Sequence, residues 1–307
     1  MALAALAAGP RPREYYVVAG LLALAAIIAP GPLYVLALTV FGLPHVLWEL
    51  AWLRATYGKQ LPQAWWYLLL AILTVQLIAR LGAWLGLLAS ELVAGLDLVT
   101  LALVLVASAA LIATEQGCRR WGRLLLALGL SALLIMAVRC ATVVLPLMLL
   151  AIAHNFTPLL LVPTSAKLHG KSARRILLHL FALPVLIVLG LSLDGLWGFG
   201  LNQPLGHVWL PSEATWLGHY LPAAAAGILS GLVLAQCLHY YSVIRLLPAA
   251  TQTPKIALPW RLGAIAIAAL LSTYFLYDFA EAKGLYAVAA GFHAWLEWPL
   301  ILMIISG

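Results

Sequence analysis

Runs of apolar residues, each about long enough to cross a lipid bilayer, recur along almost the whole chain. A transmembrane helix needs about 20 mostly apolar residues, because each residue advances the helix by about 1.5 Å through a hydrocarbon core of about 30 Å. On this measure the sequence predicts spanning segments at residues 15–29, 33–54, 62–88, 97–114, 124–139, 141–163, 177–193, 221–247, 259–279 and 285–306. If neighbouring segments form one kinked helix, at 30–32 or near Arg139, the number falls to eight or nine.

The composition excludes a water-soluble globular protein. Hydrophobic residues make up 65% of the 307 residues and charged residues 9%, and the mean hydropathy is +1.05. A soluble protein of this size could not cover so apolar a chain with solvated side chains. We therefore predict an all-α, polytopic integral membrane helical bundle with about eight to ten transmembrane helices. Residues 1–307 are expected to form a single integral membrane domain.

Basic residues gather on one side of the predicted layout. The side that holds the N-terminus carries most of the 17 lysines and arginines: Arg11, Arg13, Arg54, Lys59, Arg119, Arg120, Arg123, Lys167, Lys171, Arg174, Arg175, Arg245, Lys255 and Arg261. By the positive-inside rule both termini are cytoplasmic, and the longest loop, at about residues 194–220, lies outside. The net charge of +7 then reflects topology and requires no nucleic-acid partner. We expect an integral protein of a bacterial inner (cytoplasmic) membrane whose N-terminus is retained, because the first residues lack the basic start of a signal peptide.

Several familiar chemical signatures are absent from the sequence. The three cysteines have no paired spacing, so neither a disulfide framework nor a zinc motif is indicated. The chain contains no HExxH metalloprotease motif, no GxSxG nucleophile elbow and no P-loop. These absences leave the intramembrane histidines as the main chemical signal.

Four of the eight histidines fall inside predicted spanning segments: His45, His154, His239 and His293. In the predicted topology their four segments all run from the outside inward. Each histidine lies between 8 and 13 residues from the cytoplasmic end of its segment. At about 1.5 Å per residue the depths agree within about 8 Å, so the four imidazoles are placed to meet at one point.

Convergence of imidazoles is what a buried transition metal requires, since neutral imidazole binds iron, copper and zinc. Two of the four histidines are followed one helical turn later by a glutamate: Glu49 follows His45, and Glu297 follows His293. Ligating histidines usually give their second N–H to a carboxylate, so we predict that each glutamate orients the histidine of its own helix. A dinuclear site with both glutamates as ligands stays open, as does the use of single histidines as hydrogen-bonding residues between helices.

Aromatic residues neighbour these histidines along the chain, namely Trp48, Phe156, Tyr240, Tyr241 and Trp295. We expect them to line an apolar substrate cavity, with ordinary core packing as the alternative. Elsewhere, the pairs Gly82/Gly86 and Gly227/Gly231 have the GxxxG spacing that favours close helix packing.

The segment Gly42-Leu43-Pro44-His45, with an acid four residues after the histidine, resembles the early motif GLPHGALD of the Brp/Blh family of membrane carotene dioxygenases. Here Glu49 occupies the aspartate position of that motif. The family is polytopic, of similar length, and places histidines on several helices, the last followed closely by an acid, as His293 is by Glu297. The resemblance implies a non-haem iron held by histidines and cleavage of β-carotene at its central double bond into two retinals.

Together these features predict a membrane-embedded non-haem iron oxygenase whose catalytic residues are His45, His154, His239 and His293. The predicted metal site comprises these four histidines together with Glu49 and Glu297. Iron(II) is the expected metal, with copper and zinc as alternatives. The expected partners are a hydrophobic small molecule from the bilayer, O₂ and lipid, and carotenoid cleavage is the leading specific reaction. The competing interpretation is a metal-ion or proton-coupled transporter that uses the same histidines as transient ligands. A third interpretation is that the protein is a structural assembly factor.

Overall fold

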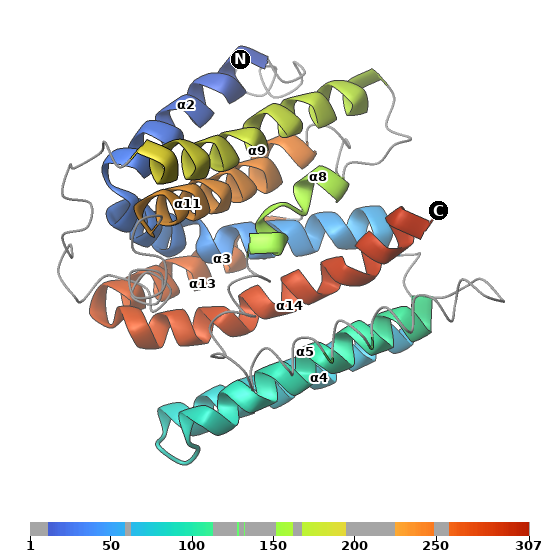
Figure 1. The fold of residues 1–307 in the computed structure, drawn as a ribbon. Coiled ribbons are helices and arrows are strands. Elements are labelled where there is room, and N and C mark those ends of the chain that lie inside the picture. The colour runs from blue at the N-terminus through green and yellow to red at the C-terminus, as the bar shows by residue number, and fades with distance from the viewer. Residues whose placement is uncertain are drawn as a thin grey trace. The chain divides into compact units, whose positions relative to one another are not determined.

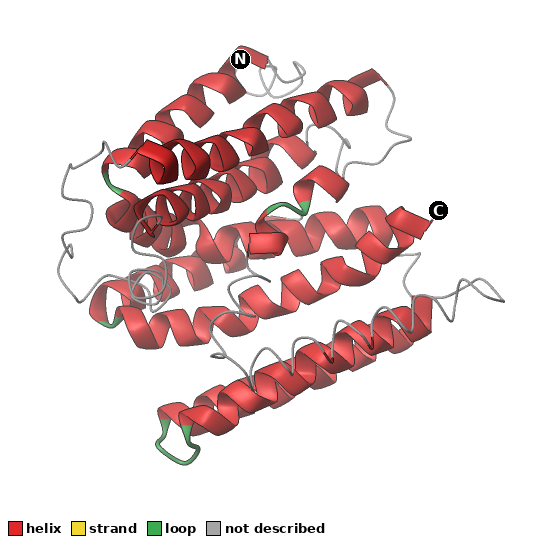
Figure 2. Cartoon of the chain, in the orientation of Figure 1, coloured by secondary structure: helices red, strands yellow, loops and turns green. Residues whose placement is uncertain are grey.

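The computed structural model describes residues 12–58, 63–112, 128, 132, 152–161, 168–194, 225–248 and 258–306. Within these ranges the chain is helical apart from short turns, and it contains no strand (Figure 2). The predicted all-α class is therefore confirmed for the described part of the chain. Apart from residues 128 and 132, the predicted segment 124–139 lies outside the described residues, as does most of 141–163.

The elements follow one another along the chain as shown in Figure 1. They are α2 (Pro12–Ile28), α3 (Pro30–Tyr57), α4 (Gln63–Trp84), α5 (Ser90–Ile112), α8 (Pro158–Leu161), α9 (Leu168–Asp194), α11 (Ala225–Tyr241), the π-helical turn η1 (Ser242–Leu246), α13 (Leu258–Tyr277) and α14 (Phe279–Ser306).

Several helices begin earlier than the apolar segments that predict them. The helix expected at 177–193 begins at Leu168, and that expected at 285–306 begins at Phe279. Backbone hydrogen bonds continue through polar residues beyond an apolar stretch, so hydropathy underestimates helix length. The break expected at 30–32 lies instead at Ala29, and Pro30 opens α3, where its missing N–H costs no intrahelical bond.

Four described helices are long and apolar enough to cross a membrane: Pro30–Tyr57, Gln63–Trp84, Ala173–Leu191 and Gly227–Leu246. Leu262–Tyr277 forms a shorter apolar helix. This supports the prediction of a membrane protein. The total of eight to ten spanning helices and the cytoplasmic termini stay predictions.

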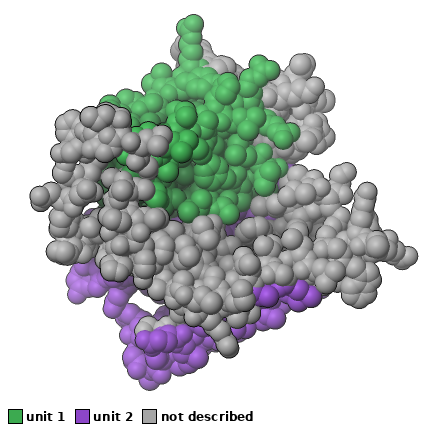
Figure 3. All heavy atoms as spheres, viewed as in Figure 1, with its two compact units in different colours: residues 1–48, 151–255 green, residues 49–150, 256–307 purple. Residues whose placement is uncertain are grey.

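The chain divides into two compact units, coloured green and purple in Figure 3. The first unit comprises residues 1–48 and 151–255, and the second comprises residues 49–150 and 256–307. Helix α3 runs through the boundary after Trp48, so one continuous helix carries residues of both units. The single domain expected over residues 1–307 stays a prediction.

In the first unit α11 is the central helix. It packs against α9 and α2, which also contact each other (Figure 1). Buried residues occur on every face of α11, including Leu234, Leu238 and Tyr240. At Gly231 the backbones of α11 and α9 approach so closely that a Cβ atom would lie 2.9 Å from the carbonyl oxygen of Pro184. The close packing predicted from the GxxxG spacing is therefore confirmed at Gly231.

In the second unit α4 and α5 form a helical hairpin, and α14 packs against α4, α5 and α13. The hairpin turns at Gly86, whose φ of 71° ends α4 in a left-handed conformation. The amide of Leu87 then donates to the carbonyl of Gly82, and the amide of Gly86 to that of Ala83, which is the Schellman pattern. Helix α14 is capped by Asp278, whose carboxylate accepts the amide hydrogen of Glu281 at 2.9 Å.

The faces of helix α4 differ in how far their side chains are buried. One stripe of this helix is buried, and it contains Trp65, Leu69 and Gln76, whose amide donates to the buried Thr100 hydroxyl of α5. Other faces expose large apolar residues, such as Leu70 and Ile78. Exposed apolar surface of this extent is unfavourable in water and is typical of a helix that contacts lipid.

Candidate metal centre

Helix α3 places His45 one residue after a proline. Pro44 has no N–H to give to the preceding turn, which loosens the helix there. Nδ1 of His45 lies 3.1 Å from the carbonyl oxygen of Phe41, four residues earlier. A carbonyl oxygen only accepts hydrogen bonds, so Nδ1 carries the hydrogen, and in the neutral ring Nε2 keeps its lone pair for a metal.

Helix α11 places His239 between two other imidazoles. The ring of His239 meets that of His45 edge-on with centroids 5.4 Å apart, and its centroid is 4.5 Å from that of His154. His154 lies in a short helical turn before α8, where the Thr157 hydroxyl donates to the His154 carbonyl at 2.8 Å. His45 and His239 are buried, and His154 is half-buried. Three imidazoles therefore lie close together within the first unit, with their ring planes inclined to one another.

Helix α14 places His293 in a similar way to His45. Its Nδ1 lies 3.4 Å from the carbonyl oxygen of Ala289, four residues earlier on the same helix. Its Nε2 lies 3.6 Å from Oε2 of Glu49, and both side chains are buried, at 1% and 0% exposure. Nδ1 thus faces the helix backbone, and Nε2 faces a carboxylate.

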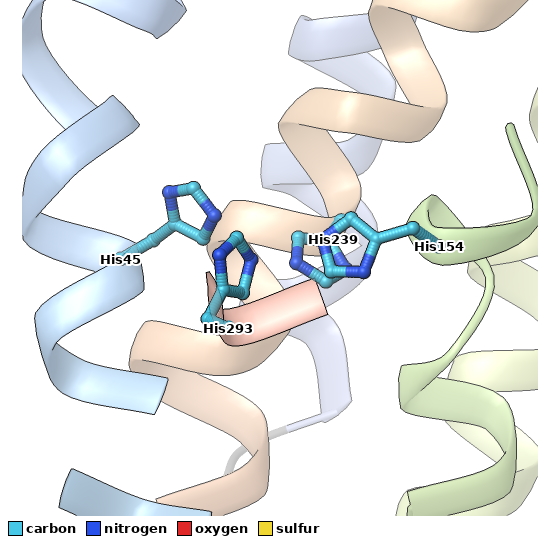
Figure 4. A group of neighbouring side chains, drawn as sticks. All are labelled: His45, His154, His239 and His293. Atoms are coloured by element: carbon cyan, nitrogen blue, oxygen red, sulfur yellow. The ribbon is translucent and has the colours of Figure 1, made fainter. Parts of the chain in front are cut away.

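Each of the four histidines offers one ring nitrogen, and these four atoms all lie within 4.8 Å of one another. Figure 4 shows the four rings gathered from separate helical segments. Two ligands on opposite sides of an ion, with bonds of about 2.1 Å, are about 4.2 Å apart. The four nitrogens are therefore close enough together for the group to hold a metal ion. The structure thus brings together the four residues whose depths predict convergence.

The predicted orienting roles of the two carboxylates stay predictions. Glu49 lies beside His293 of α14, and Nδ1 of His45 lies within hydrogen-bond distance of the Phe41 carbonyl oxygen. Glu297, one turn after His293, is buried at 1% exposure. The i,i+4 spacing predicts that each pair shares a helix face but does not determine which neighbouring helix that face meets.

The aromatic residues expected to line a substrate cavity have separate surroundings. Tyr240 stacks on His45 with centroids 3.8 Å apart, Phe156 packs against Phe181 of α9, and Tyr241 meets the ring of Tyr15. Trp48 is half-buried. The side chain of Trp295 lies outside the described residues. A substrate-lining role for the five stays a prediction, and for Tyr240 the structure adds contact with a candidate ligand.

Two features of the site have little or no signal in the sequence. The Phe41 carbonyl is a backbone group, and only the proline before His45 indicates that the local helix is unusual. The π-helical turn η1 begins three residues after His239 and changes the helix register directly beyond the site. Single π turns inside helices are frequent at functional sites, but no residue type predicts them.

No protein-family model, curated protein or solved structure matches this chain. The resemblance to the Brp/Blh family therefore stays a prediction based on the motif around His45. What the protein does is argued below from the chemistry of the four histidines and the helices that hold them.

Proposed function

We propose that this protein is a membrane-embedded non-haem iron oxygenase that acts on a hydrophobic substrate. The observation that carries the proposal is the group of four imidazoles whose nitrogens lie within 4.8 Å of one another. Two of these histidines belong to helices apolar enough to cross a membrane. Intramembrane ionisable residues are costly and usually mark function.

The residues of the chain would perform three tasks in this reaction. His45, His154, His239 and His293 would hold iron(II), which supplies activation of O₂ when bound. The Phe41 carbonyl holds His45 in the tautomer that leaves Nε2 available. Burial of three of the four histidines keeps bulk water from the site, which suits oxidation of an apolar molecule drawn from the bilayer.

Oxidative cleavage of a carotenoid to retinal-type products is the leading specific reaction. Two arguments support it: the motif around His45 resembles that of membrane carotene dioxygenases, and a carotenoid dissolves in the bilayer that the apolar helices are suited to cross.

Elemental analysis of the detergent-purified protein tests the metal. We expect about one iron per chain, lost when any one of the four histidines is replaced by alanine, since each supplies one of few ligands. His179→Ala is the matched control, because His179 is an exposed histidine of α9 that bonds to the Tyr16 hydroxyl. Full iron occupancy in the His154→Ala variant would contradict the four-ligand site.

Turnover then tests the reaction. Iron-loaded protein in carotenoid-containing liposomes should produce retinal-type aldehydes with consumption of O₂, and the His239→Ala variant should not. Metal uptake into sealed liposomes without such products would support the transporter instead. Metal-free protein after iron-replete expression would overturn the proposal.

A further inference from the structure

Helices α2 and α9 of the first unit are joined at their surface by one pair of side chains. The Tyr16 hydroxyl and Nδ1 of His179 are 2.8 Å apart, and the centroids of the two rings are 6.0 Å apart. Both side chains are exposed, so this hydrogen bond lies on the outside of the unit. The two helices contact each other and run in the same direction (Figure 1). Tyr16 and His179 therefore mark a common level on both helices.

An arginine lies one helical turn before each member of this pair. Arg13 precedes Tyr16 by three residues on α2, and on α9 Arg175 precedes His179 by four residues. Residues three or four apart lie on the same helix face, so both arginines belong to the faces that the hydrogen bond joins. Both are exposed, as is the neighbouring Arg174.

The end of α11 and the turn η1 bring one more arginine to this end of the unit. The ring of Tyr15 on α2 meets that of Tyr241 on α11, with centroids 5.7 Å apart. Arg245 follows Tyr241 by four residues, and it is exposed. Glu14, which precedes Tyr15, is the exposed acid at the start of α2. Arginines therefore outnumber carboxylates among the described residues at this end.

Beyond the hydrogen-bonded pair the same two helices expose apolar side chains. These are Val17, Leu21, Leu24 and Ile28 on α2, and Leu186 and Leu189 on α9. At about 1.5 Å per residue, the row from Val17 to Ile28 is about 16 Å long. One leaflet contributes about 15 Å to a hydrocarbon core of about 30 Å. The row therefore matches the depth of one lipid acyl chain.

Small residues lie between the charged and the apolar parts of this surface. Gly20 follows Tyr16 by four residues, and Ala182 follows His179 by three. Both are exposed, and a Cβ atom at Gly20 would have nothing within 4 Å. A hydrocarbon chain can therefore lie against the helices directly beyond the hydrogen-bonded pair.

We propose that this surface of α2 and α9 binds an anionic phospholipid, with the phosphate at Arg13 and Arg175 and an acyl chain along the apolar row. Guanidinium groups bind phosphate oxygens through paired hydrogen bonds. This end is the predicted cytoplasmic one, and basic pockets between transmembrane helices on that side bind anionic headgroups. The positive-inside rule accounts for basic loops, whereas these two arginines lie within helices at the start of an apolar row.

The inference goes beyond the proposed oxygenase and does not depend on the metal centre. None of the four candidate metal ligands belongs to this surface. Failure of the lipid site would leave the proposed function standing, and metal-free protein would leave the lipid site standing.

Lipid retention tests the inference. The full-length protein in detergent would be titrated with phosphatidylglycerol, or with phosphatidylcholine of the same acyl chains. The lipid retained per chain after gel filtration would be measured by mass spectrometry. Phosphatidylglycerol should bind more than about tenfold more tightly, because it carries a net negative charge and each basic residue near a membrane surface contributes about fivefold.

Variants locate the site. Arg13→Gln and Arg175→Gln should each weaken phosphatidylglycerol binding by about fivefold. The matched control is Arg54→Gln, which neutralises an exposed arginine in the last turn of α3 and should leave retention unchanged. Equal affinities in these three variants would overturn the inference.

Two further outcomes would also overturn it. Equal retention of the two lipids by the unchanged protein is one, and this comparison does not require any variant to fold. Displacement of phosphatidylglycerol by millimolar inorganic phosphate is the other, because it would mean that the arginines bind free phosphate. We expect no displacement, since inorganic phosphate lacks the acyl chains that contact the apolar row.

Discussion

At the scale of single residues, His45 is held on two sides by neighbours that differ in chemistry. The Phe41 carbonyl accepts its Nδ1 hydrogen, and the ring of Tyr240 stacks on its face at an interplanar angle of 26°. Tyr240 is itself held, because its hydroxyl accepts a hydrogen bond of 2.6 Å from Gln236 one turn earlier. Together these contacts limit the orientations that the imidazole can adopt.

The stacking contact leads to a prediction at Tyr240. Tyr240→Phe keeps the ring and should bind iron nearly as tightly as the unchanged protein. Tyr240→Leu removes the ring and should weaken iron binding by about 10–100-fold, the usual cost of losing a residue that orients a ligand. Competition with a chelator of known affinity measures both effects. Tyr241→Leu is the control, since that ring contacts Tyr15. Equal affinity in the Phe and Leu variants would contradict the orienting role.

At the scale of the helices, the contact between α9 and α11 depends on the absence of a side chain. A Cβ atom at Gly231 would overlap a methyl carbon of Val188 and would lie 2.9 Å from the Pro184 carbonyl oxygen. The methyl group can turn away, but the backbone oxygen cannot move without shifting its helix. Because α11 carries His239, this contact also positions a candidate ligand.

Gly231→Ala should therefore destabilise the protein by about 1–3 kcal/mol, the usual cost of overpacking a filled interior. Thermal unfolding in detergent should show a lower midpoint. Gly190→Ala is the matched control on α9, because a Cβ atom there would have nothing within 4 Å. That change should be neutral or slightly stabilising, since alanine favours a helix over glycine by about 0.5–1 kcal/mol. Equal unfolding midpoints for Gly231→Ala and Gly190→Ala would contradict this prediction, because a side chain at the close approach of α9 and α11 would then not destabilise the protein.

At the scale of the whole molecule, the uneven distribution of basic residues predicts orientation in the membrane. Most lysines and arginines fall on the side assigned to the N-terminus. Positively charged loops are retained in the cytoplasm during insertion, so both termini should lie there.

Reporter fusions in a bacterial host test this orientation. Alkaline phosphatase, which folds only outside the cytoplasm, should be inactive at the C-terminus and active when inserted in the loop at 194–220. A fluorescent protein at the C-terminus should be bright. Active phosphatase at the C-terminus would reverse the predicted topology and change the assignment of every loop.

Much of the fold follows from local properties of the sequence. Apolar length identifies α3, α4, α11 and α13 to within a few residues of most of their ends, because helix hydrogen bonds join residues only four positions apart. The same locality explains the errors at the start of α9 and α14, where polar residues continue the helix. The four histidines could be selected from sequence because depth in a membrane helix is proportional to residue number.

The partners of the side chains were decided by the tertiary structure. Residue number determines how deep Glu49 lies, whereas the rotation of α3 and the position of α14 determine that it meets His293. The stacking of Tyr240 on His45 likewise depends on how α11 packs beside α3. The sequence by itself predicted an apolar, helical chain, which the described residues confirm, and it singled out the four histidines that lie together. The packing of its helices decided which atoms face one another, because contacts between helices depend on rotations that no local pattern encodes.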